Sequence, residues 1–117
     1  NLSISTLTKI NCLLVKKILE SFYKGKITLK TPNDLLIDKK KISGILQEII
    51  TINNQKFLII GIGINLVKSP KIKGYPTTNL HELVNKYINK SIIEKKLKLL
   101  FEKNLSRMYK INKLDNL

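Results

Sequence analysis

The sequence predicts an α+β domain in which one helix precedes a mostly antiparallel or mixed sheet and two flanking helices follow. Three observations support this order: apolar residues at helical spacing before residue 24, four Ile- and Leu-rich segments between residues 26 and 66, and helical spacing again after residue 79. The chain has 117 residues, of which 43% are hydrophobic. It is therefore long enough for one domain, or for part of one.

The first helix is expected over residues 5–24, with Ser5 or Thr6 as its N-cap and Gly25 at its end. Four strands should follow, at residues 26–30, 35–38, 41–52 and 56–66. Residues 38–40 and the pair Asn53-Asn54 supply turns, and a two-residue Asn-Asn loop suits a tight hairpin. The predicted core of helix and sheet is Ile10, Leu14, Ile18, Ile45, Ile49, Leu58, Ile60 and Ile62.

A surface loop is expected at residues 67–78, where Pro70, Gly74 and Pro76 occur. Two helices follow from residue 79. The second begins with SIIE, in which Ser91 and Glu94 are spaced as a capping box.

The charge is strongly positive, because 22 lysine and arginine residues outnumber 8 acidic ones and give a net charge of +14. Such a charge favours an anionic partner, such as nucleic acid, phosphate esters or an acidic protein. Arg107 is the only arginine, whereas sequence-specific nucleic-acid readers use arginine for bidentate contacts. We therefore expect no specific nucleic-acid binding and attribute the lysine excess to a biased composition.

Cys12 is the only cysteine, so the chain has no internal disulfide and no cysteine-based metal site. It lies among apolar residues and is expected to be a small buried side chain. The longest apolar run, residues 57–67, is too short for a membrane-spanning helix. No signal peptide opens the chain. These features predict a cytoplasmic protein without a membrane partner.

Residues 30–46, KTPNDLLIDKKKISGIL, combine turn residues with one acid and one lysine in a tight frame. If residues 35–46 form a hairpin, Asp34 and Lys41 lie near opposite ends of its arms, and the spacing does not force them into contact. From spacing alone, a turn residue is a more frequent role for Asp34 than a catalytic one. Lys41, the third lysine of KKK, also fits a solvated turn. Lys41 nevertheless begins a strand, and Gly44 follows where a missing side chain lets a ligand approach the backbone. A lysine there would neutralise a carboxylate and an α-phosphate together during phosphoryl transfer.

The segment GIGIN, residues 61–65, places Gly61 and Gly63 on one face of a strand. A third glycine and a following helix are missing, so it is not a dinucleotide-binding fingerprint. Two bare backbone positions on one face can receive a flat or bulky ligand, although glycines also mark a bend or a β-bulge. Asn65, at the end of the apolar run, suits a cap or a ligand contact.

Three motifs thus stand in a fixed order: KTPNDL at residues 30–35, KISGILQE at 41–48 and GIGIN at 61–65. They resemble the second half of the catalytic domain of bacterial biotin–protein ligases, whose pattern is K-W-P-N-D-L, K-hydrophobic-small-G-I-L-x-E and G-hydrophobic-G-hydrophobic-N. The segment YPTTNLHEL is similar to the family's proline–threonine–small–leucine segment. The resemblance implies the class II synthetase-like fold of biotin and lipoate ligases. Lipoate–protein ligases share a related pattern, but P-N-D-L and G-I-G-I-N favour biotin.

The resemblance implies an enzyme that makes biotinyl-adenylate from biotin and ATP with Mg²⁺. The enzyme would then transfer biotin to a lysine of the biotin carboxyl carrier domain of a carboxylase. Lys41 matches the catalytic lysine that contacts the biotin carboxylate and the phosphate, and Asp34 matches the acid that orients or deprotonates the acceptor lysine. The matching biotin-pocket positions are Gly44, Gly61 and Gly63, and the matching ATP-side positions are Asn33 and Asn65. No residue is implied as a metal ligand.

The sequence also departs from the family pattern. Thr31 stands where the family usually has tryptophan, and nothing corresponds to the first half of the catalytic domain, with its Gly-Arg-Gly-Arg-type loop, or to the C-terminal barrel. We therefore expect residues 1–117 to be a partial catalytic domain that is inactive when isolated, with a companion polypeptide as one source of the missing half. A lipoate-ligase-like segment, a degenerate remnant and a basic nucleic-acid-binding module are the alternatives.

Overall fold

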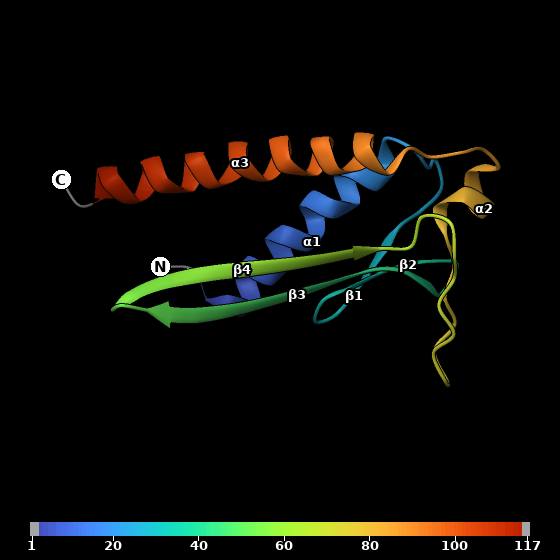
Figure 1. Ribbon diagram of the computed structural model, residues 1–117, viewed down its shortest axis with the longest axis horizontal. Coiled ribbons are helices and arrows are strands. Elements are labelled where there is room, and N and C mark those ends of the chain that lie inside the picture. Colours follow the sequence, from blue (N-terminus) through green and yellow to red (C-terminus); the bar gives the residue numbers. More distant parts are fainter. Residues whose placement is uncertain (1–2, 116–117) are drawn as a thin grey trace.

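The computed structural model describes the backbone of residues 3–115 and the side chains of residues 3–104. Its elements follow the predicted α+β order (Figure 1). They are α1 (Ile4–Glu20), β1 (Thr28–Lys30), β2 (Asp34–Ile37), β3 (Lys40–Ile52), β4 (Gln55–Ile64), α2 (Leu80–Val84) and α3 (Lys90–Asp115). The predicted fold class is therefore confirmed.

The four strands form one antiparallel sheet in the order β1-β2-β3-β4. Two-residue turns join β2 to β3 and β3 to β4. Both residues of each turn have positive φ, 50° and 64° at Asp38-Lys39 and again at Asn53-Asn54. Such turns match the right-handed twist of the strands that they connect. Lys40, which the sequence predicts in the first turn, belongs to β3 instead.

Helix α1 begins and ends earlier than predicted. Ser3, rather than Ser5 or Thr6, is the N-cap, and its Oγ accepts a hydrogen bond from the backbone N–H of Thr6 at 3.2 Å. At the other end Ser21 bonds to the carbonyl of Ile18 through both its N–H and its hydroxyl. The carbonyls of Ile18 and Leu19 thus find partners at residues 21–23, and the helix ends before Gly25 is reached.

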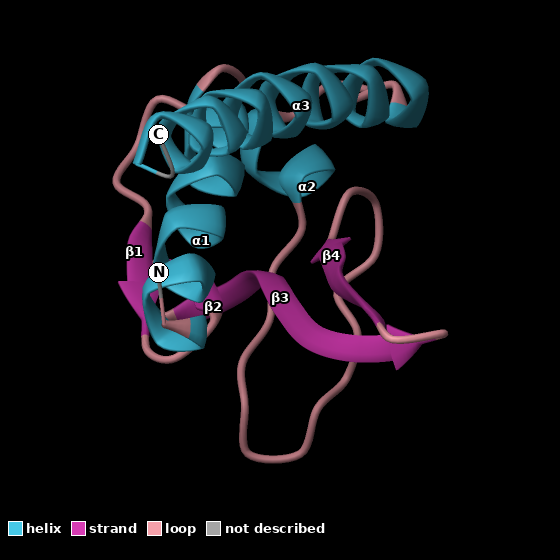
Figure 2. Cartoon of the chain, turned by 90° about the vertical axis from the view of Figure 1, so that its left-hand side faces the viewer, coloured by secondary structure: helices cyan, strands magenta, loops and turns pink. Residues whose placement is uncertain are grey.

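The core lies between α1, the inner face of the sheet and the C-terminal helices. Figure 2 shows the helices on one side of the long β3–β4 hairpin. The core side chains are Cys12, Val15, Ile18, Leu19, Ile27, Leu35, Ile37, Ile42, Ile45, Leu80, Ile88, Ile93 and Phe101. The predicted burial of Cys12 is confirmed. That burial, and then the negative charge of Asp34, raise the pKa of the Cys12 thiol, which favours its neutral form.

The predicted core is correct at the open end of the β3–β4 hairpin and wrong closer to the turn that joins the two strands. Ile18 and Ile45 are buried, and Leu14, Ile60 and Ile62 pack against the core, whereas Ile10 and Leu58 are only half-buried. Ile49 is 48% exposed, so its assignment to the core was wrong. It lies in a part of the hairpin where most residues between 48 and 57 are exposed.

The opposite face of the hairpin carries mostly apolar side chains, interrupted by Glu48 opposite Ile59 and Gln55 opposite Ile52. Because β3 and β4 pair in unbroken register, Leu46, Ile50 and Ile52 share one face with Phe57 and Ile59. Exposure is 66% for Leu46, 53% for Ile52 and 45% for Phe57. We call these five residues the open apolar face. Apolar side chains so exposed and so close together mark an interaction surface.

The two C-terminal helices begin at asparagine caps. Asn79 Oδ1 accepts from the N–H of Glu82 at 2.8 Å, and Asn89 Oδ1 accepts from the N–H of Ser91 at 2.9 Å. The predicted capping box of Ser91 and Glu94 was wrong, because α3 already begins at Lys90. No helix in the described part of the chain is long and apolar enough to cross a membrane.

We predict that Leu35→Ala lowers the free energy of unfolding by about 2–5 kcal/mol, because it leaves a cavity in the core. Leu35 is 0% exposed on β2, next to the site described below. The matched control is Leu46→Ala on the open apolar face, which removes the same atoms from a side chain that is 66% exposed and should cost far less. Urea unfolding followed by circular dichroism measures both. Equal losses would contradict the assigned core.

Candidate active site

A β-bulge brings the predicted acid, lysine and glycine to one face of the sheet. Asp34 lies opposite Gly44, and the register shifts before the pair that contains Lys41. Ile42 and Ser43 are both buried although they are neighbours, whereas strict alternation would bury only one of them. The extra residue therefore turns Lys41 and Gly44, three positions apart, toward the same face.

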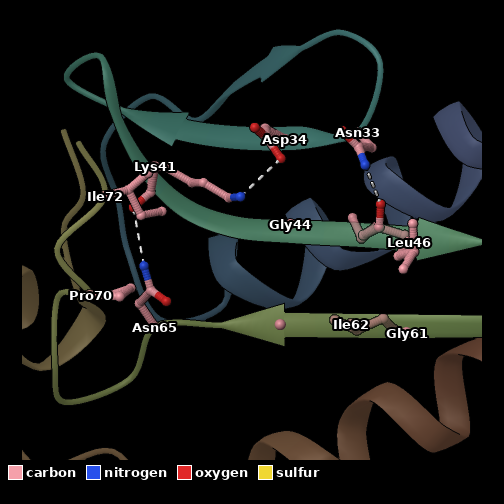
Figure 3. A pocket seen from close by; sticks show the side chains of 12 residues that line it. Asn33, Asp34, Lys41, Gly44, Leu46, Gly61, Ile62, Asn65, Pro70 and Ile72 are labelled. Atoms are coloured by element: carbon pink, nitrogen blue, oxygen red, sulfur yellow. Dashed lines mark hydrogen bonds and ion pairs between the residues drawn. The ribbon is translucent and has the colours of Figure 1, made fainter. Parts of the chain in front are cut away.

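Lys41 reaches across Gly44 to Asp34 (Figure 3). Its Nζ lies 3.4 Å from Asp34 Oδ1, and the two side chains are 26% and 16% exposed. A Cβ at position 44 would lie 3.1 Å from both Cε and Nζ of Lys41 and 3.3 Å from Oδ1 of Asp34. The ion pair therefore fills the space that Gly44 leaves free of a side chain. That space is not simply an opening for a ligand. Asp34 and Lys41 are thus in contact, although their spacing in the sequence did not require it.

A pocket of about 520 Å³ opens beside this ion pair. Its volume lies within the range of small-molecule sites. Its lining includes all of the predicted site residues, namely Asn33, Asp34, Lys41, Gly44, Gly61, Gly63 and Asn65, together with Ile45, Leu46, Ile62, Pro70 and Ile72. The structure thus brings together residues from three separate motifs. Their individual roles stay predictions.

Gly61 and Gly63 form the floor of this pocket, and the space around them differs from that around Gly44. Gly63 lies opposite Gly44, and Gly61 lies opposite Leu46. A Cβ at Gly61 would come no closer than 3.6 Å to the carbonyl oxygen of Leu46, and one at Gly63 no closer than 3.8 Å to that of Gly44. A methyl group would therefore fit at either position, and its absence deepens the pocket down to the backbone.

The two asparagines brace the pocket through their amide NH₂ groups. Asn33 Nδ2 donates to the carbonyl oxygen of Ile45 at 2.7 Å. Asn65 Nδ2 donates to the carbonyl oxygens of Lys41 at 3.2 Å and Thr78 at 3.1 Å. Both side chains thus tie β-strand ends to neighbouring backbone, and Figure 3 shows a dashed line from each asparagine.

Tyr75 is a site residue that sequence reasoning missed. It comes from the loop between β4 and α2, and its hydroxyl donates to Asp34 Oδ2 at 2.6 Å. Burial, and then the hydrogen bond to Asp34 and the charge of Asp34, raise the pKa of Tyr75 to about 12. The two residues are 41 positions apart, so no local spacing could have signalled their contact.

The described residues contain no group of three or more His, Cys, Asp or Glu side chains that could hold a metal ion. Asp34 lines the pocket, but Lys41 and Tyr75 already engage its two oxygens. A divalent ion that enters with a nucleotide would therefore depend mainly on phosphate oxygens and water, as Mg²⁺ commonly does.

The sequence profile of the Biotin/lipoate A/B protein ligase family matches residues 4–65. Comparison with curated proteins finds no match. Among solved structures, the biotin protein ligase from Aquifex aeolicus in complex with biotin and ATP has 30% identity and a TM-score of 0.73, over 90% of this chain and 44% of that chain.

Two more distant structures share the fold. The biotin protein ligase from Leishmania major in complex with biotinyl-5-AMP has 20% identity and a TM-score of 0.68, over 98% of this chain and 55% of that chain. P. falciparum LipL1 in complex with lipoate has 22% identity and a TM-score of 0.60, over 92% of this chain and 32% of that chain.

The chain spans less than half the length of the Aquifex aeolicus enzyme, since it covers 44% of that chain. The profile match nevertheless spans all four strands of the described sheet, and it includes both strands that carry Asp34 and Lys41 as well as the glycine floor. With more than half of its residues matched by the profile, this chain belongs to the Biotin/lipoate A/B protein ligase family.

Proposed function

We propose that residues 1–117 form the second half of the catalytic domain of a biotin–protein ligase. The observation that carries this proposal is the Asp34–Lys41 ion pair, which lies over Gly44 at the edge of a glycine-floored pocket. An acid and a cation at one end of a pocket suit a reaction in which an acyl-phosphate forms and is then attacked by an amine. The 30% identity to a biotin- and ATP-bound enzyme favours biotin as the substrate.

In the proposed first step, a biotin carboxylate oxygen attacks the α-phosphorus of ATP and pyrophosphate leaves. Negative charge would build on the phosphate oxygens, and the ammonium group of Lys41 would stabilise it. In the second step, the amine of an acceptor lysine attacks the acyl carbonyl and AMP leaves. Asp34 would accept the proton that the amine loses. The backbone at Gly61 and Gly63 would hold the biotin ring system.

Mg²⁺ would neutralise phosphate charge when it enters with ATP. Asn33 and Asn65 would lie on the nucleotide side, where their amide oxygens remain available after their NH₂ groups have bonded to the backbone. The acceptor would be the biotin carboxyl carrier domain of a carboxylase.

The open apolar face supports a further part of the proposal, namely that the segment corresponding to the first half of the catalytic domain packs there. This face continues along the hairpin from the glycine floor. The Aquifex aeolicus enzyme contains more than half of its length outside the region that this chain matches, since the match covers 44% of it. Burying Leu46, Phe57 and Ile59 under such a segment would also enclose the pocket and exclude water from it.

The test uses the 117-residue chain alone and the chain completed by the corresponding first half of the Aquifex aeolicus enzyme. We call the latter the completed enzyme, whether it is joined in one polypeptide or mixed in trans. We expect no detectable biotinyl-adenylate from the isolated chain, and biotin-dependent pyrophosphate release and carrier biotinylation from the completed enzyme. The first half alone is the control. Binding of an apolar dye to the open apolar face should fall on completion.

Each other outcome has a defined meaning. Turnover with lipoate instead of biotin would favour the lipoate-ligase alternative. No turnover from a completed enzyme that has folded and assembled would favour a degenerate remnant. Adenylate synthesis by the isolated chain would overturn the proposal that it is a partial catalytic domain.

A further inference from the structure

The carboxylate of Asp34 is held from two sides. Its Oδ1 faces Lys41 at 3.4 Å, and its Oδ2 accepts the hydroxyl proton of Tyr75 at 2.6 Å. The distance to Tyr75 is short, as is typical of a hydroxyl that donates to a charged carboxylate. Each oxygen thus has its own partner, and the rotation of the carboxylate about its last bond is restricted.

Backbone bonds set the position of Tyr75. The residue after it, Pro76, accepts from the N–H of Lys41 at 2.8 Å, and the N–H of Thr78 donates to the carbonyl of Lys41 at 2.9 Å. Thr77 and Lys41 form a parallel bridge. The sequence predicts residues 67–78 as a surface loop, but its last residues are in fact attached to the same lysine that pairs with Asp34. The phenol and the ammonium group therefore reach the carboxylate from adjacent backbone segments.

Two lysines lie close to the ring of Tyr75. The Nζ of Lys30 lies 4.3 Å from the ring centroid and the Nζ of Lys41 lies 5.6 Å from it. Both distances are within the range of cation–π attraction. The charged groups around the phenol are therefore Lys30 on β1, Asp34 on β2 and Lys41 on β3, one from each of three neighbouring strands.

We propose that Tyr75 is a positioning residue that orients the carboxylate of Asp34. This inference rests on the function proposed above, because the orientation matters for the attack of an acceptor amine. Tyr75 is not among the residues that line the pocket, but its hydroxyl bonds to Asp34, which does, so its effect on the reaction would pass through Asp34. By holding Oδ2, it leaves Oδ1 on the side of Lys41 and the pocket, where the proton of the amine would be taken up.

The first test uses the isolated chain and needs no activity. Tyrosinate absorbance is recorded during alkaline titration, and circular dichroism at each pH confirms that the chain stays folded. Tyr75 should ionise near pH 12. Tyr75→Phe should remove this late step, and Asp34→Asn should move it toward the ordinary value. The matched control is Tyr87→Phe, which removes the same hydroxyl from a residue that is 74% exposed and should leave the late step intact.

The same bond predicts how stability depends on pH. Because the pKa of Tyr75 is raised from 10 to about 12 in the folded state, the native protein holds this proton more tightly than the unfolded chain does. Its contribution is complete below pH 10 and is lost as the pH rises toward 12. The difference in unfolding free energy between the wild type and Tyr75→Phe should therefore shrink over that range.

The second test uses the completed enzyme at neutral pH. Tyr75→Phe keeps the ring beside Lys30 and loses only the hydroxyl, and a lost hydrogen bond to a charged group should slow transfer from preformed biotinyl-adenylate by about 10- to 100-fold. The KM for biotin in adenylation should stay near that of the wild type, as it should in Tyr87→Phe. Equal slowing of both steps would assign Tyr75 a merely structural role and overturn the proposal.

The two tests separate this proposal from the proposed function. The completed enzyme could lack ligase activity while the late ionisation of Tyr75 still depends on Asp34. That result would contradict the proposed function but support the contact between Tyr75 and Asp34. A late step that persists in Tyr75→Phe, or that Asp34→Asn does not move, would overturn the inference whatever the activity. If the chain unfolds before the late step, the kinetic comparison decides.

Discussion

Lys41→Ala should lower the rate of biotinyl-adenylate formation by the completed enzyme about 10²- to 10³-fold, the usual cost of removing one preorganised group that stabilises charge in a transition state. Lys41 is suited to this role because its ammonium group lies at the pocket, is only 26% exposed and is held by Asp34. Biotin-dependent pyrophosphate release measures the effect.

The matched control for this substitution is Lys39→Ala. Lys39 lies in the exposed turn between β2 and β3, so its replacement changes the net charge of the protein by the same amount. It should leave adenylation nearly unchanged, because it does not line the pocket. Equal losses for both lysines would show that overall charge, and not the placement of Lys41, governs the rate. The role assigned to Lys41 would then be wrong.

Asp34→Asn should affect the second step more than the first. Loss of a general base typically slows a proton transfer by about 10²- to 10⁴-fold, so biotin transfer from preformed adenylate to the carrier domain should fall by that order. Adenylation should fall less, since Lys41 remains, although it loses its ion-pair partner at 3.4 Å. Single-turnover transfer and pyrophosphate release measure the two steps separately.

Asp38→Asn is the control for the acid. Asp38 is exposed in the turn with a φ of 50°, a conformation that asparagine tolerates well. The substitution removes the same negative charge without touching the pocket, and both steps should proceed at the wild-type rate. A loss of adenylation as large as the loss of transfer in Asp34→Asn would instead mean that Asp34 serves mainly to hold Lys41.

The order of the elements could be predicted from the sequence because it depends on local patterns. Apolar residues at helical spacing indicated α1, and the Asn53-Asn54 pair indicated a hairpin in which both residues have positive φ. The two-residue spacing of Gly61 and Gly63 placed both glycines on one face, as the register with β3 confirms. Even here the ends of α1 were missed, since Ser3 and Ser21 cap it. The choice among nearby serines and threonines depends on geometry that a pattern does not contain.

The candidate site itself was decided by the tertiary structure. An extra residue at the bulge puts Lys41 on the same face as Gly44, and strict strand alternation would have placed them on opposite faces. The position of Tyr75 against Asp34, 41 residues away, depends on how the loop before α2 attaches to β3. Strand alternation puts Ile49 on the same face as Ile45, yet Ile49 is 48% exposed and Ile45 is buried. Sequence patterns report neighbours a few residues apart, whereas register shifts and contacts between distant segments arise only when the chain is folded.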